Sequence, residues 1–455
     1  MSRYPGLDWE MIYIITEFGA VGDGRCNCTA AIQKALDQCC IQGGGTVSIP
    51  PGVYLTGTIY LHSHTRLEIR KGAVLKAIPD RTYYNRADFT PQNIASVREK
   101  TDGTHLIAAV NVEDIAISGG GVIDGNREAF FDPEKYTRDT FPGLRPAQML
   151  YFCESVNITL QDIQLRNAAY WSCFLHGCRE VMISCVRIRT GRQDWNGDGL
   201  DIDCCTNVII SGCDIDTADD CIAIRANGKN LVNTPAETAQ VTISNCILRS
   251  NQAAVRFGVG SGTIRECSLG NLCIIDCTLG ITIHGHYSHS QNTGLVIRDI
   301  QISDVFIRSR LIPFCIMEHY ALLPQEDGNG ADISNITIRN MRGYAAGTGL
   351  IQGDHDRKIR DIILQDIDLT IGGGHRIVKE ADENDHRRIG DGWRFYQPYA
   401  FAVLCSENIV CRNMRLHWSN DRSGLWETPF YAEDTVNCDF EQLSCDPLPQ
   451  TNQMK

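Results

Sequence analysis

Two short stretches in the middle of the sequence combine residue types that could do acid–base chemistry. DWNGDGLDID, from Asp194 to Asp203, and TADDCIAIR, from Thr217 to Arg225, together carry six aspartates. Four interpretations are open for so many carboxylates: a metal site, a pair of catalytic acids, a solvated acidic surface, or bend residues that happen to be charged. The elements that position these side chains decide among them.

A short pattern that recurs along the chain predicts those elements. Apolar residues alternate with others on both sides of two positions rich in Asn, Asp, Ser or Gly, as in VNITLQDIQL, VMISCVRI and VIISGCDI. The copies begin roughly 23 to 33 residues apart and alternate with period two, which indicates short strands separated by polar bends. Because one such unit cannot cover its own apolar face, the units should stack. We therefore predict an all-β fold, a single-stranded right-handed parallel β-helix of about ten coils.

A capping helix is predicted before the first coils. Residues 27–42 have an amphipathic pattern with Asn27 as the N-cap, and glycines at 43–45 end it. The residues expected to face the interior are Ile32, Ala35, Leu36 and Cys39. Such a helix would cover the open end of a solenoid formed by residues 46–445. No linker-like stretch divides the chain, so the sequence predicts one domain over residues 1–455.

The 21 cysteines are interpreted as free and mostly buried thiols. Their number is odd, the chain is long and no export signal is visible, which argues against a disulfide framework. Aligning the repeats places one residue of each copy in the same inward row: Ile163, Val186, Cys213, Cys246, Cys277 and Ile300. Pairs such as Cys26 and Cys28 lack the spacing of a zinc site, so neither a metal nor another cofactor is expected.

Charge and hydropathy narrow the classes of partner. The net charge of −13 argues against a nucleic-acid partner, because binding phosphates requires a basic surface. No apolar run approaches the length of a membrane span, and the first residues carry acids within their apolar stretch, so no membrane association and no signal peptide are predicted. A cytoplasmic location is the resulting expectation. The sequence makes no prediction of the oligomeric state.

The repeat register brings the two acidic stretches together. Asp198 and Asp219 are 21 residues apart, close to one coil, so they should stack on neighbouring parallel strands about 4.8 Å apart. Three such close carboxylates, with Asp220 as the third, cannot all ionise freely, which favours a protonated acid beside an ionised base. One coil step plus side-chain reach could supply the roughly 6.5 to 9.5 Å between acid and base in inverting glycosidases.

The remaining aspartates of this region have a simpler interpretation. Asp214, Asp216 and Asp276 are read as solvated bend residues, as an Asp near such polar positions usually is. Asp201 and Asp203 alternate with Leu200 and Ile202, and one of them could anchor backbone amides at a bend.

Several motifs, in order along the chain, resemble those of glycoside hydrolase family 28, the polygalacturonase-like members of the pectin-lyase-like superfamily. They are FGAVGDG at 18–24, GGVIDGN at 120–126, the pair Arg145-Pro146, RNAAYWSCFLHGC at 166–178, and the two acidic stretches. The resemblance implies hydrolysis of α-glycosidic bonds with inversion, in which one aspartic acid protonates the leaving oxygen and two others activate water. Asp198 matches the family's first aspartate, and Asp219 and Asp220 match its Asp-Asp pair.

The chain differs from the family at the motifs that bind galacturonate in polygalacturonases. The Gly-His-Gly and Arg-x-Lys motifs have no counterpart, and NQAAVRFGVGSG occupies the first of these places. Arg225, Arg256 and His284 would instead form a cationic strip on successive coils, suited to an acidic sugar. The alternatives are that the arginines pair with the aspartates and that His284 is an ordinary surface residue.

Further binding residues are suggested by position or type. Trp171 and Trp195 could stack on sugar rings, although a packed tryptophan is an equally good interpretation of Trp171. Asn196 lies in the first acidic motif. Coil counting places Glu318, with Tyr320, at the next coil along the expected cleft.

These observations predict an inverting glycoside hydrolase. Its substrate partner would be a pectin-type, uronic-acid-containing oligosaccharide, and a cytoplasmic location would favour exo action on short, imported chains. Two alternatives remain: a Ca²⁺-dependent polysaccharide lyase in which Arg256 removes a proton, and a carbohydrate-binding solenoid without catalytic activity.

Overall fold

The chain forms two compact units. The computed structural model describes residues 11–86, 99–132, 134–286, 294–319, 330–372, 399–420 and 428–447. Unit 1 consists of Met1–Asp219 and Gly228–Pro235, and unit 2 of Asp220–Asn227 and Ala236–Lys455. The boundary between them falls at the peptide bond between Asp219 and Asp220. The single domain expected from the sequence stays a prediction.

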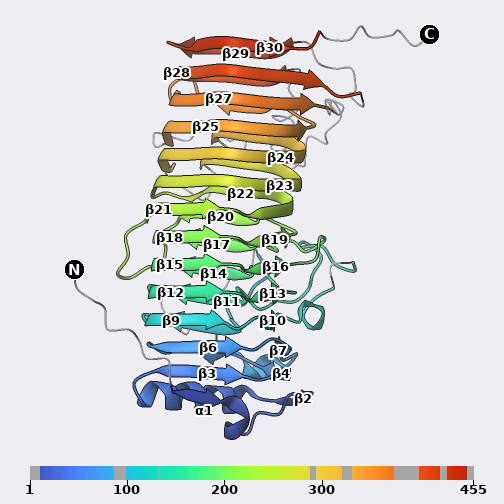
Figure 1. The fold of residues 1–455 in the computed structure, drawn as a ribbon, viewed down its shortest axis with the longest axis vertical. Coiled ribbons are helices and arrows are strands. Elements are labelled where there is room, and N and C mark those ends of the chain that lie inside the picture. Colours follow the sequence, from blue (N-terminus) through green and yellow to red (C-terminus); the bar gives the residue numbers. More distant parts are fainter. Residues whose placement is uncertain are drawn as a thin grey trace. The chain divides into compact units, whose positions relative to one another are not determined.

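Unit 1 is built from three parallel sheets (Figure 1). The first contains β3 (Gly45–Ile49), β6 (Thr65–Ile69), β9 (Glu113–Ser118), β12 (Val156–Gln161), β15 (Arg179–Ser184) and β18 (Thr206–Ser211). The second contains β4 (Gly52–Thr56), β7 (Ala73–Ala77), β10 (Val122–Asp124), β13 (Gln164–Arg166), β16 (Arg187–Arg189) and β19 (Asp214–Thr217). The third contains β5 (Ile59–Tyr60), β8 (Ile107–Val110), β11 (Leu150–Cys153), β14 (Cys173–His176) and β17 (Leu200–Asp203).

Short elements complete unit 1. β1 (Ile12–Ile14) pairs with β3, and β2 (Asp23–Asn27) pairs with β4. Three short 3₁₀ turns occupy Ile15–Phe18, Arg81–Tyr83 and Arg127–Ala129.

Unit 2 continues the same architecture with strands that run through the bends. They are β20 (Ile222–Ala226), β21 (Glu237–Ser244), β22 (Ile247–Gly260), β23 (Thr263–His286), β24 (Val296–His319), β25 (Asp332–Ala345), β26 (Gly349–Gln352), β27 (Ile359–Ile371), β28 (Tyr399–Trp418), β29 (Thr428–Val436) and β30 (Asp439–Cys445). Every pairing among them is parallel, for example between β23 and β24 along their whole length. The predicted fold class, a right-handed parallel β-helix, is confirmed.

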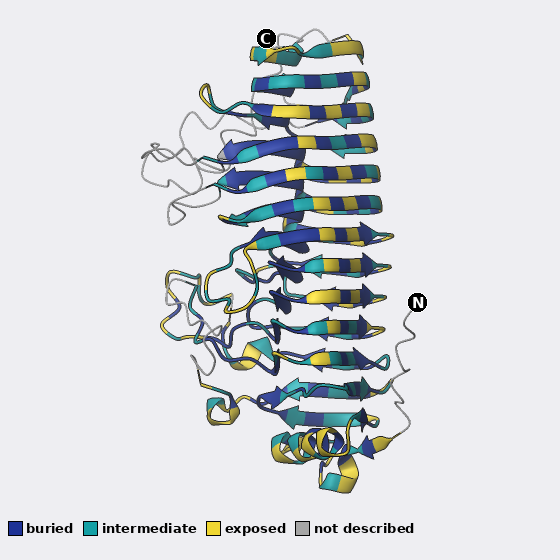
Figure 2. Ribbon diagram, turned by 90° about the vertical axis from the view of Figure 1, so that its left-hand side faces the viewer, coloured by how far each residue is buried: buried dark blue, intermediate teal, exposed yellow. Residues whose placement is uncertain are grey.

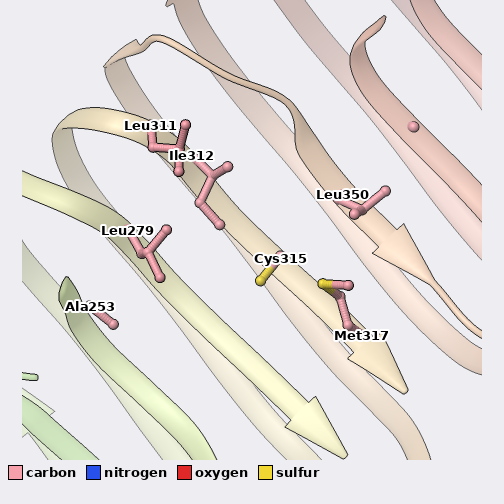
Figure 3. Packing of buried hydrophobic residues seen from close by; sticks show 8 residues of the cluster. Ala253, Leu279, Leu311, Ile312, Cys315, Met317 and Leu350 are labelled. Carbon is pink, nitrogen blue, oxygen red and sulfur yellow. The ribbon is translucent and has the colours of Figure 1, made fainter. Parts of the chain in front are cut away.

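Alternation along each strand builds the core, as the bands of Figure 2 show. In unit 1, Leu67, Ile117, Leu160, Ile183 and Ile210 stand in register on successive coils, and none is more than 1% exposed. A second apolar cluster lies in unit 2 and includes Leu279, Ile312 and Leu350 (Figure 3). Aliphatic side chains therefore stack along both units, which is why the repeat pattern was visible in the sequence.

The bends explain the abundance of cysteine. At several bends a residue in the left-handed conformation is followed by an inward thiol, and the S–H donates to the carbonyl of the residue before the bend. The sulfur–oxygen distances are 3.3 Å for Cys205 to Asp203, 3.2 Å for Cys246 to Ser244 and 3.4 Å for Cys267 to Arg265. A thiol fills the small apolar space and also offers a weak donor to that carbonyl. All 21 cysteines are free thiols, in agreement with the sequence interpretation.

The predicted inward row is only partly correct. Ile163, Val186 and Cys213 each precede a paired residue of β13, β16 and β19, so these three share one row as expected. In unit 2, however, Ile247 pairs with Cys273, which places Cys246 in register with Leu272. Cys277 instead pairs with Ser250 and Ser309, and Ile300 pairs with Cys267. Cys277 and Ile300 therefore belong to other rows, because the same apolar alternation occurs on more than one side of each coil and the sequence alignment matched different sides of successive coils.

The N-terminal helix caps unit 1 as predicted. α1 spans Thr29–Ile41 and buries the four residues expected to face inward, Ile32, Ala35, Leu36 and Cys39. Asn27 accepts the Thr29 N–H at 2.9 Å, one position earlier than a standard N-cap. The amide of Gln33 accepts the Tyr60 N–H at 2.8 Å and donates to the Tyr60 carbonyl at 3.2 Å. The helix thus pairs a strand edge that has no further coil beside it. None of the helices that the structure describes has both the length and the apolar character needed to cross a bilayer.

Replacing Gln33 by alanine should destabilise unit 1 by about 1 to 3 kcal/mol, because the backbone N–H and the backbone carbonyl of Tyr60 each lose a hydrogen bond to its side chain. Urea unfolding followed by far-UV circular dichroism measures the loss. Lys34→Ala, at the neighbouring exposed position of the helix, is the control and should change the unfolding free energy by less than about 0.5 kcal/mol. Equal stability of Gln33→Ala and the parent would contradict the capping role.

Candidate active site

Asp198 and Asp219 lie together in unit 1. Asp198 stands just before β17 and is 2% exposed, whereas Asp219 is half-buried and ends the unit's main segment. The Thr190 hydroxyl donates to the Gly197 carbonyl at 3.1 Å and accepts the Ala218 N–H at 2.9 Å. It therefore ties together the residues directly before the two aspartates. A carboxylate oxygen of Asp198 lies within 4.8 Å of one of Asp219.

This separation corrects one expectation from the sequence. The predicted spacing of roughly 6.5 to 9.5 Å between acid and base is not found for this pair. The physical reason is that equivalent residues on neighbouring parallel strands lie only about 4.8 Å apart, and these side chains do not diverge. Two carboxyl groups at this distance repel when both are charged, so proton sharing between them is favoured.

A buried arginine holds the segment that carries Asp198. Arg145 is fully buried, and its guanidinium donates to the carbonyls of Ala169 and Trp195, both at 2.8 Å. It also donates to the side-chain oxygen of Asn196 at 3.0 Å. Burial lowers the pKa of Arg145 to about 10, which leaves the group charged at neutral pH. Asn196, predicted to bind substrate, thus uses its oxygen to fasten this segment to the solenoid.

An ion pair closes the other side of the same segment. Arg127 donates to both carboxylate oxygens of Asp194, at 2.7 and 2.6 Å, and the Gly191 N–H donates to one of them at 2.8 Å. Burial raises the pKa of Asp194 despite these partners. Asp194 is therefore a structural member of the acidic stretch.

Asp201 and Asp203 occupy strand β17 and are almost completely buried. Their register partners on the preceding coil are Phe174 and His176. The bend after this strand begins at Cys204, whose φ is 54° and whose thiol donates to an Asp203 carboxylate oxygen at 3.4 Å. The anchoring of backbone amides by one of the two aspartates stays a prediction.

The two tryptophans are packed. Trp171 stacks on Tyr170 with ring centroids 4.8 Å apart and contacts the edge of Phe174 at 5.3 Å. Trp195 lies 4.7 Å from Phe131, and the Arg145 guanidinium lies 4.8 Å from its ring. Trp171 is half-buried, so part of its surface remains available to a ligand.

In unit 2, Asp220 is held as a carboxylate. It forms an ion pair with Arg256, and its other oxygen accepts the Ala253 N–H at 3.2 Å. Asp220 is 2% exposed and Arg256 is 9% exposed. The structure thus supports the alternative in which Arg256 pairs with an aspartate, and a guanidinium engaged in this way favours the charged form of its partner.

The proposed cationic strip is staggered. Ile224, Phe257 and Ile283 are paired, so the residues that follow them, Arg225 and His284 among them, stand near one row. Gly258 takes that row in the middle coil, where a Cβ would meet the His284 carbonyl at 3.2 Å. Arg256 stands two residues earlier on the same strand face.

His284 and Glu318 are both buried residues of unit 2. His284 is 1% exposed, with its Nε2 3.3 Å from the Cys315 sulfur, so it is not an ordinary surface residue. Glu318 accepts the Ala331 N–H at 2.8 Å and lies 3.8 Å from Arg357. Its predicted contact with substrate stays a prediction. Tyr320 lies outside the described residues.

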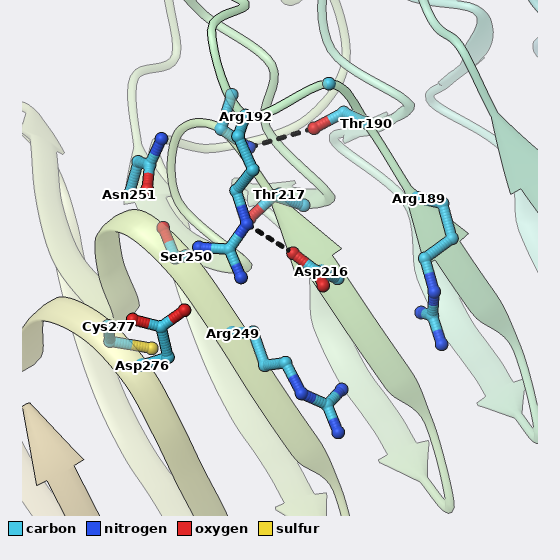
Figure 4. Close-up of polar contacts among 12 residues, drawn as sticks. Arg189, Thr190, Arg192, Asp216, Thr217, Arg249, Ser250, Asn251, Asp276 and Cys277 are labelled. Atoms are coloured by element: carbon cyan, nitrogen blue, oxygen red, sulfur yellow. Dashed lines mark hydrogen bonds and ion pairs between the residues drawn. The ribbon is translucent and has the colours of Figure 1, made fainter.

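The three aspartates interpreted as bend residues have structural partners. Asp276 has a φ of 55° and pairs with Arg310 at 2.8 Å, as a bend residue would. Asp214 and Asp216 instead lie in strand β19 and pair with Arg189 at 2.5 Å and Arg192 at 2.9 Å. Figure 4 shows Arg192 directed at Asp216.

Comparison with known proteins gives this arrangement a family. The model described as glycosyl hydrolases family 28 matches residues 83–239, which include Asp198 and the Asp-Asp pair. Over these residues the chain is similar to glycosyl hydrolases family 28. The family predicted from the sequence is thereby confirmed, and the match supports the predicted enzyme class of glycoside hydrolase.

Curated proteins similar to this chain include polygalacturonases. A probable polygalacturonase of Vitis vinifera is 28% identical over 309 residues, which cover 65% of this chain and 59% of that protein. An endo-polygalacturonase of Pectobacterium parmentieri is 25% identical over 359 residues, covering 75% and 84%. Among solved structures, an exopolygalacturonase from Thermotoga maritima superposes with a TM-score of 0.63 at 18% identity, covering 93% of this chain and 92% of that one. The last likeness shows the fold.

Two of the other motifs that resemble family 28, GGVIDGN and RNAAYWSCFLHGC, contact each other in the structure. Arg166 donates to one Asp124 oxygen at 2.9 Å, and Asn167 donates to the other at 3.3 Å. Gly125 lies so close to the next coil that a Cβ would meet the Asn167 carbonyl at 2.5 Å. GGVIDGN and RNAAYW therefore form one contact between neighbouring coils.

Sequence reasoning missed the positioning residues of this family 28 site. Thr190, Arg127 and Arg145 act through hydrogen bonds to residues 24 or more positions away, and such contacts leave no pattern in one sequence. Arg145 had one available signal, because it belongs to an Arg-Pro pair that resembles the family. Nothing in that pair, however, indicates burial.

A buried histidine gives unit 1 a pH dependence. His105 stacks on Tyr151 with centroids 4.2 Å apart, and burial lowers its pKa to about 4. The unfolded chain therefore binds a proton between about pH 6.5 and 4 that the folded chain does not, so stability is present above this window and falls with pH inside it. We expect a loss of up to about 3 kcal/mol from this residue.

Urea unfolding of the parent and of His105→Gln at pH 7, 5.5 and 4 tests this. The parent should be the more stable of the two by a margin that shrinks as the pH falls. A margin that is the same at all three pH values would contradict the assignment.

Proposed function

We propose that the chain hydrolyses α-glycosidic bonds in a pectin-type substrate that contains uronic acid. The observation that carries this proposal is the pair of Asp198 and Asp219, held within 4.8 Å at the positions that match the family motifs. The polygalacturonases among the relatives support the substrate class.

Different surroundings support different roles for the three carboxyls. Asp220 is charge-compensated by Arg256 and accepts a backbone N–H, which suits an ionised group that activates water. Asp219 is half-buried beside the buried Asp198, and repulsion between them favours a protonated form on one. We assign Asp219 as the general acid and Asp198 and Asp220 as the groups that orient and activate water.

The basic residues suit recognition of an acidic sugar. With Arg256 committed to Asp220, Arg225 and His284 are left as the proposed partners of a substrate carboxylate. The same ion pair argues against Arg256 as the proton-abstracting base of a lyase, since that role needs a neutral guanidine.

Inversion is proposed from the resemblance to family 28 alone. The distance between Asp198 and Asp219 does not support it, because this distance is shorter than the usual spacing of acid and base in inverting enzymes. Exo action on short chains is proposed together with a reducing, cytoplasmic location. That location is supported by the 21 free thiols, which would be at risk of oxidation elsewhere.

A screen of purified protein against uronic-acid and neutral oligosaccharides tests the proposed function. Reducing ends should appear with an α-linked galacturonate oligomer, and the first product should be a monomer if action is exo. Release of long fragments from polymer would contradict exo action. Binding of every candidate without turnover over long incubation would contradict hydrolysis.

A further inference from the structure

Three metal-binding side chains meet in unit 2, away from the aspartates. They are His355 in the loop between β26 and β27, Cys405 in β28 and Asp434 in β29. Each offers one ligand atom, and these atoms all lie within 4.8 Å of one another. The His355 Nδ1 is 2.8 Å from an Asp434 oxygen and 3.8 Å from the Cys405 sulfur.

The coil register explains why residues so far apart in sequence converge. Cys405 and Asp434 stand between the same pairs of residues on neighbouring coils, since Leu404 pairs with Glu433 and Ser406 with Thr435. Both have left-handed φ values, 47° and 50°, so they are equivalent bend residues. On the coil before, Gln352 pairs with Leu404, and the loop that follows it carries His355 to the same bend. Three consecutive coils thus contribute one ligand each.

The chemistry and the spacing fit zinc. Imidazole nitrogen, thiolate and carboxylate oxygen are the ligands that Zn²⁺ takes in proteins. A tetrahedral ion with bonds of about 2.0 to 2.3 Å separates its ligand atoms by roughly 3.3 to 3.6 Å. The two distances from the His355 nitrogen, 2.8 and 3.8 Å, lie on either side of this range, and the third distance is at most 4.8 Å, so small side-chain adjustments would allow an ion to bind. The His355 side chain is 86% exposed and that of Asp434 is 34% exposed. An ion can therefore reach the site, and water can take a fourth position.

Neighbouring groups already orient the carboxylate. Lys358 donates to the second Asp434 oxygen at 2.6 Å and to the Asp434 carbonyl at 2.8 Å, which leaves the first oxygen directed at His355. Hydrogen bonds from Lys358 and His355 lower the pKa of Asp434 to about 2. Burial and the nearby Asp434 raise the pKa of Cys405 to about 11, so without an ion it is a thiol. Binding would release that proton to solvent.

We propose that His355, Cys405 and Asp434 bind one Zn²⁺ ion that joins three consecutive coils of unit 2. Such an ion would stabilise the last coil, which buries little apolar surface of its own, because the described residues of β29 and β30 are exposed or half-buried. The sequence analysis expected no metal, because the ligands are 50 and 29 residues apart and only the coil register brings them together.

Titration of chelator-treated full-length protein with Co²⁺, used as a spectroscopic substitute for Zn²⁺, tests the proposal. A thiolate-to-cobalt absorption band should rise to one equivalent and disappear when Zn²⁺ is added. Zn²⁺ should also raise the melting temperature of the parent protein.

Variants separate this site from other thiols. Cys405→Ser and His355→Ala should each lose the band, and His355→Ala, in an exposed loop, should retain the parent's circular dichroism spectrum. Cys185→Ser is the control, because Cys185 is an accessible thiol that, like Cys405, lies at a bend with a left-handed φ, here 54°. It should keep the band. Absence of a thiolate band in the parent, or an unchanged band in Cys405→Ser, would overturn the proposal.

Discussion

Replacing Asp219 by asparagine should lower kcat on an α-linked galacturonate oligomer by about 100- to 10,000-fold, the range expected for loss of a general acid. The amide cannot donate the proton that the leaving oxygen needs, whereas the fold should be unaffected at this half-buried position. Initial rates of reducing-end release measure the effect. Asp276→Asn is the control: Asp276 is an exposed bend residue with a φ of 55°, which asparagine also adopts readily, and its activity should equal that of the parent.

The leaving group distinguishes the acid from its partners. A galacturonide with a nitrophenolate leaving group needs little protonation, so Asp219→Asn should regain most of its rate on it. Asp220→Asn should stay inactive on both substrates, because it impairs the activation of water. The reverse pattern would exchange the two assignments, and full activity of Asp219→Asn on the oligomer would remove it from catalysis.

Replacing Arg145 by alanine should destabilise unit 1 by about 2 to 4 kcal/mol. Two buried carbonyls, those of Ala169 and Trp195, lose their donor at about 1 to 3 kcal/mol each, and the cation–π contact with Trp195 is lost as well. Part of this is offset because a buried charge is removed, as the lowered pKa of Arg145 indicates. Urea unfolding measures the change. Arg187→Ala, at an exposed position of β16, is the control and should be neutral.

Activity provides a second readout of the role assigned to Arg145. Since its contacts fasten the segment that carries Asp198, kcat should fall more than KM rises. Added guanidinium at millimolar concentration should restore part of kcat by occupying the space left by the side chain. Arg145→Lys should not restore it, because a single ammonium cannot reach the same set of acceptors. A variant with parental kcat and stability would contradict the positioning role.

Much of the fold was predictable because a β-helix repeats its signal. Alternating aliphatic residues such as Leu160 and Ile183 recur at the same place on each coil, and bend residues such as Asn157 and Asn207 adopt φ values of 56° and 58° that suit asparagine. The one-coil relation between Asp198 and Asp219 follows from the same repeat. The local sequence pattern of one coil therefore predicts the architecture of the neighbouring coils as well.

The remaining features depend on contacts that no repeat encodes. Arg256 forms an ion pair with Asp220. From the sequence, this ion pair and the binding of an acidic sugar were equally open alternatives. The place of Cys277 opposite Ser250 depends on which side of the coil its strand segment forms, and the apolar alternation alone does not reveal this. His355, Cys405 and Asp434 converge only because long segments between them leave the coil register unchanged.

Proton NMR of the first product tests the central claim most directly. With an α-linked galacturonate oligomer, direct attack by water activated by the aspartates should release a product whose new reducing end is first seen as the β-anomer, followed by slow mutarotation. The α-anomer as the first product, or an unsaturated product that absorbs in the ultraviolet, would contradict the account.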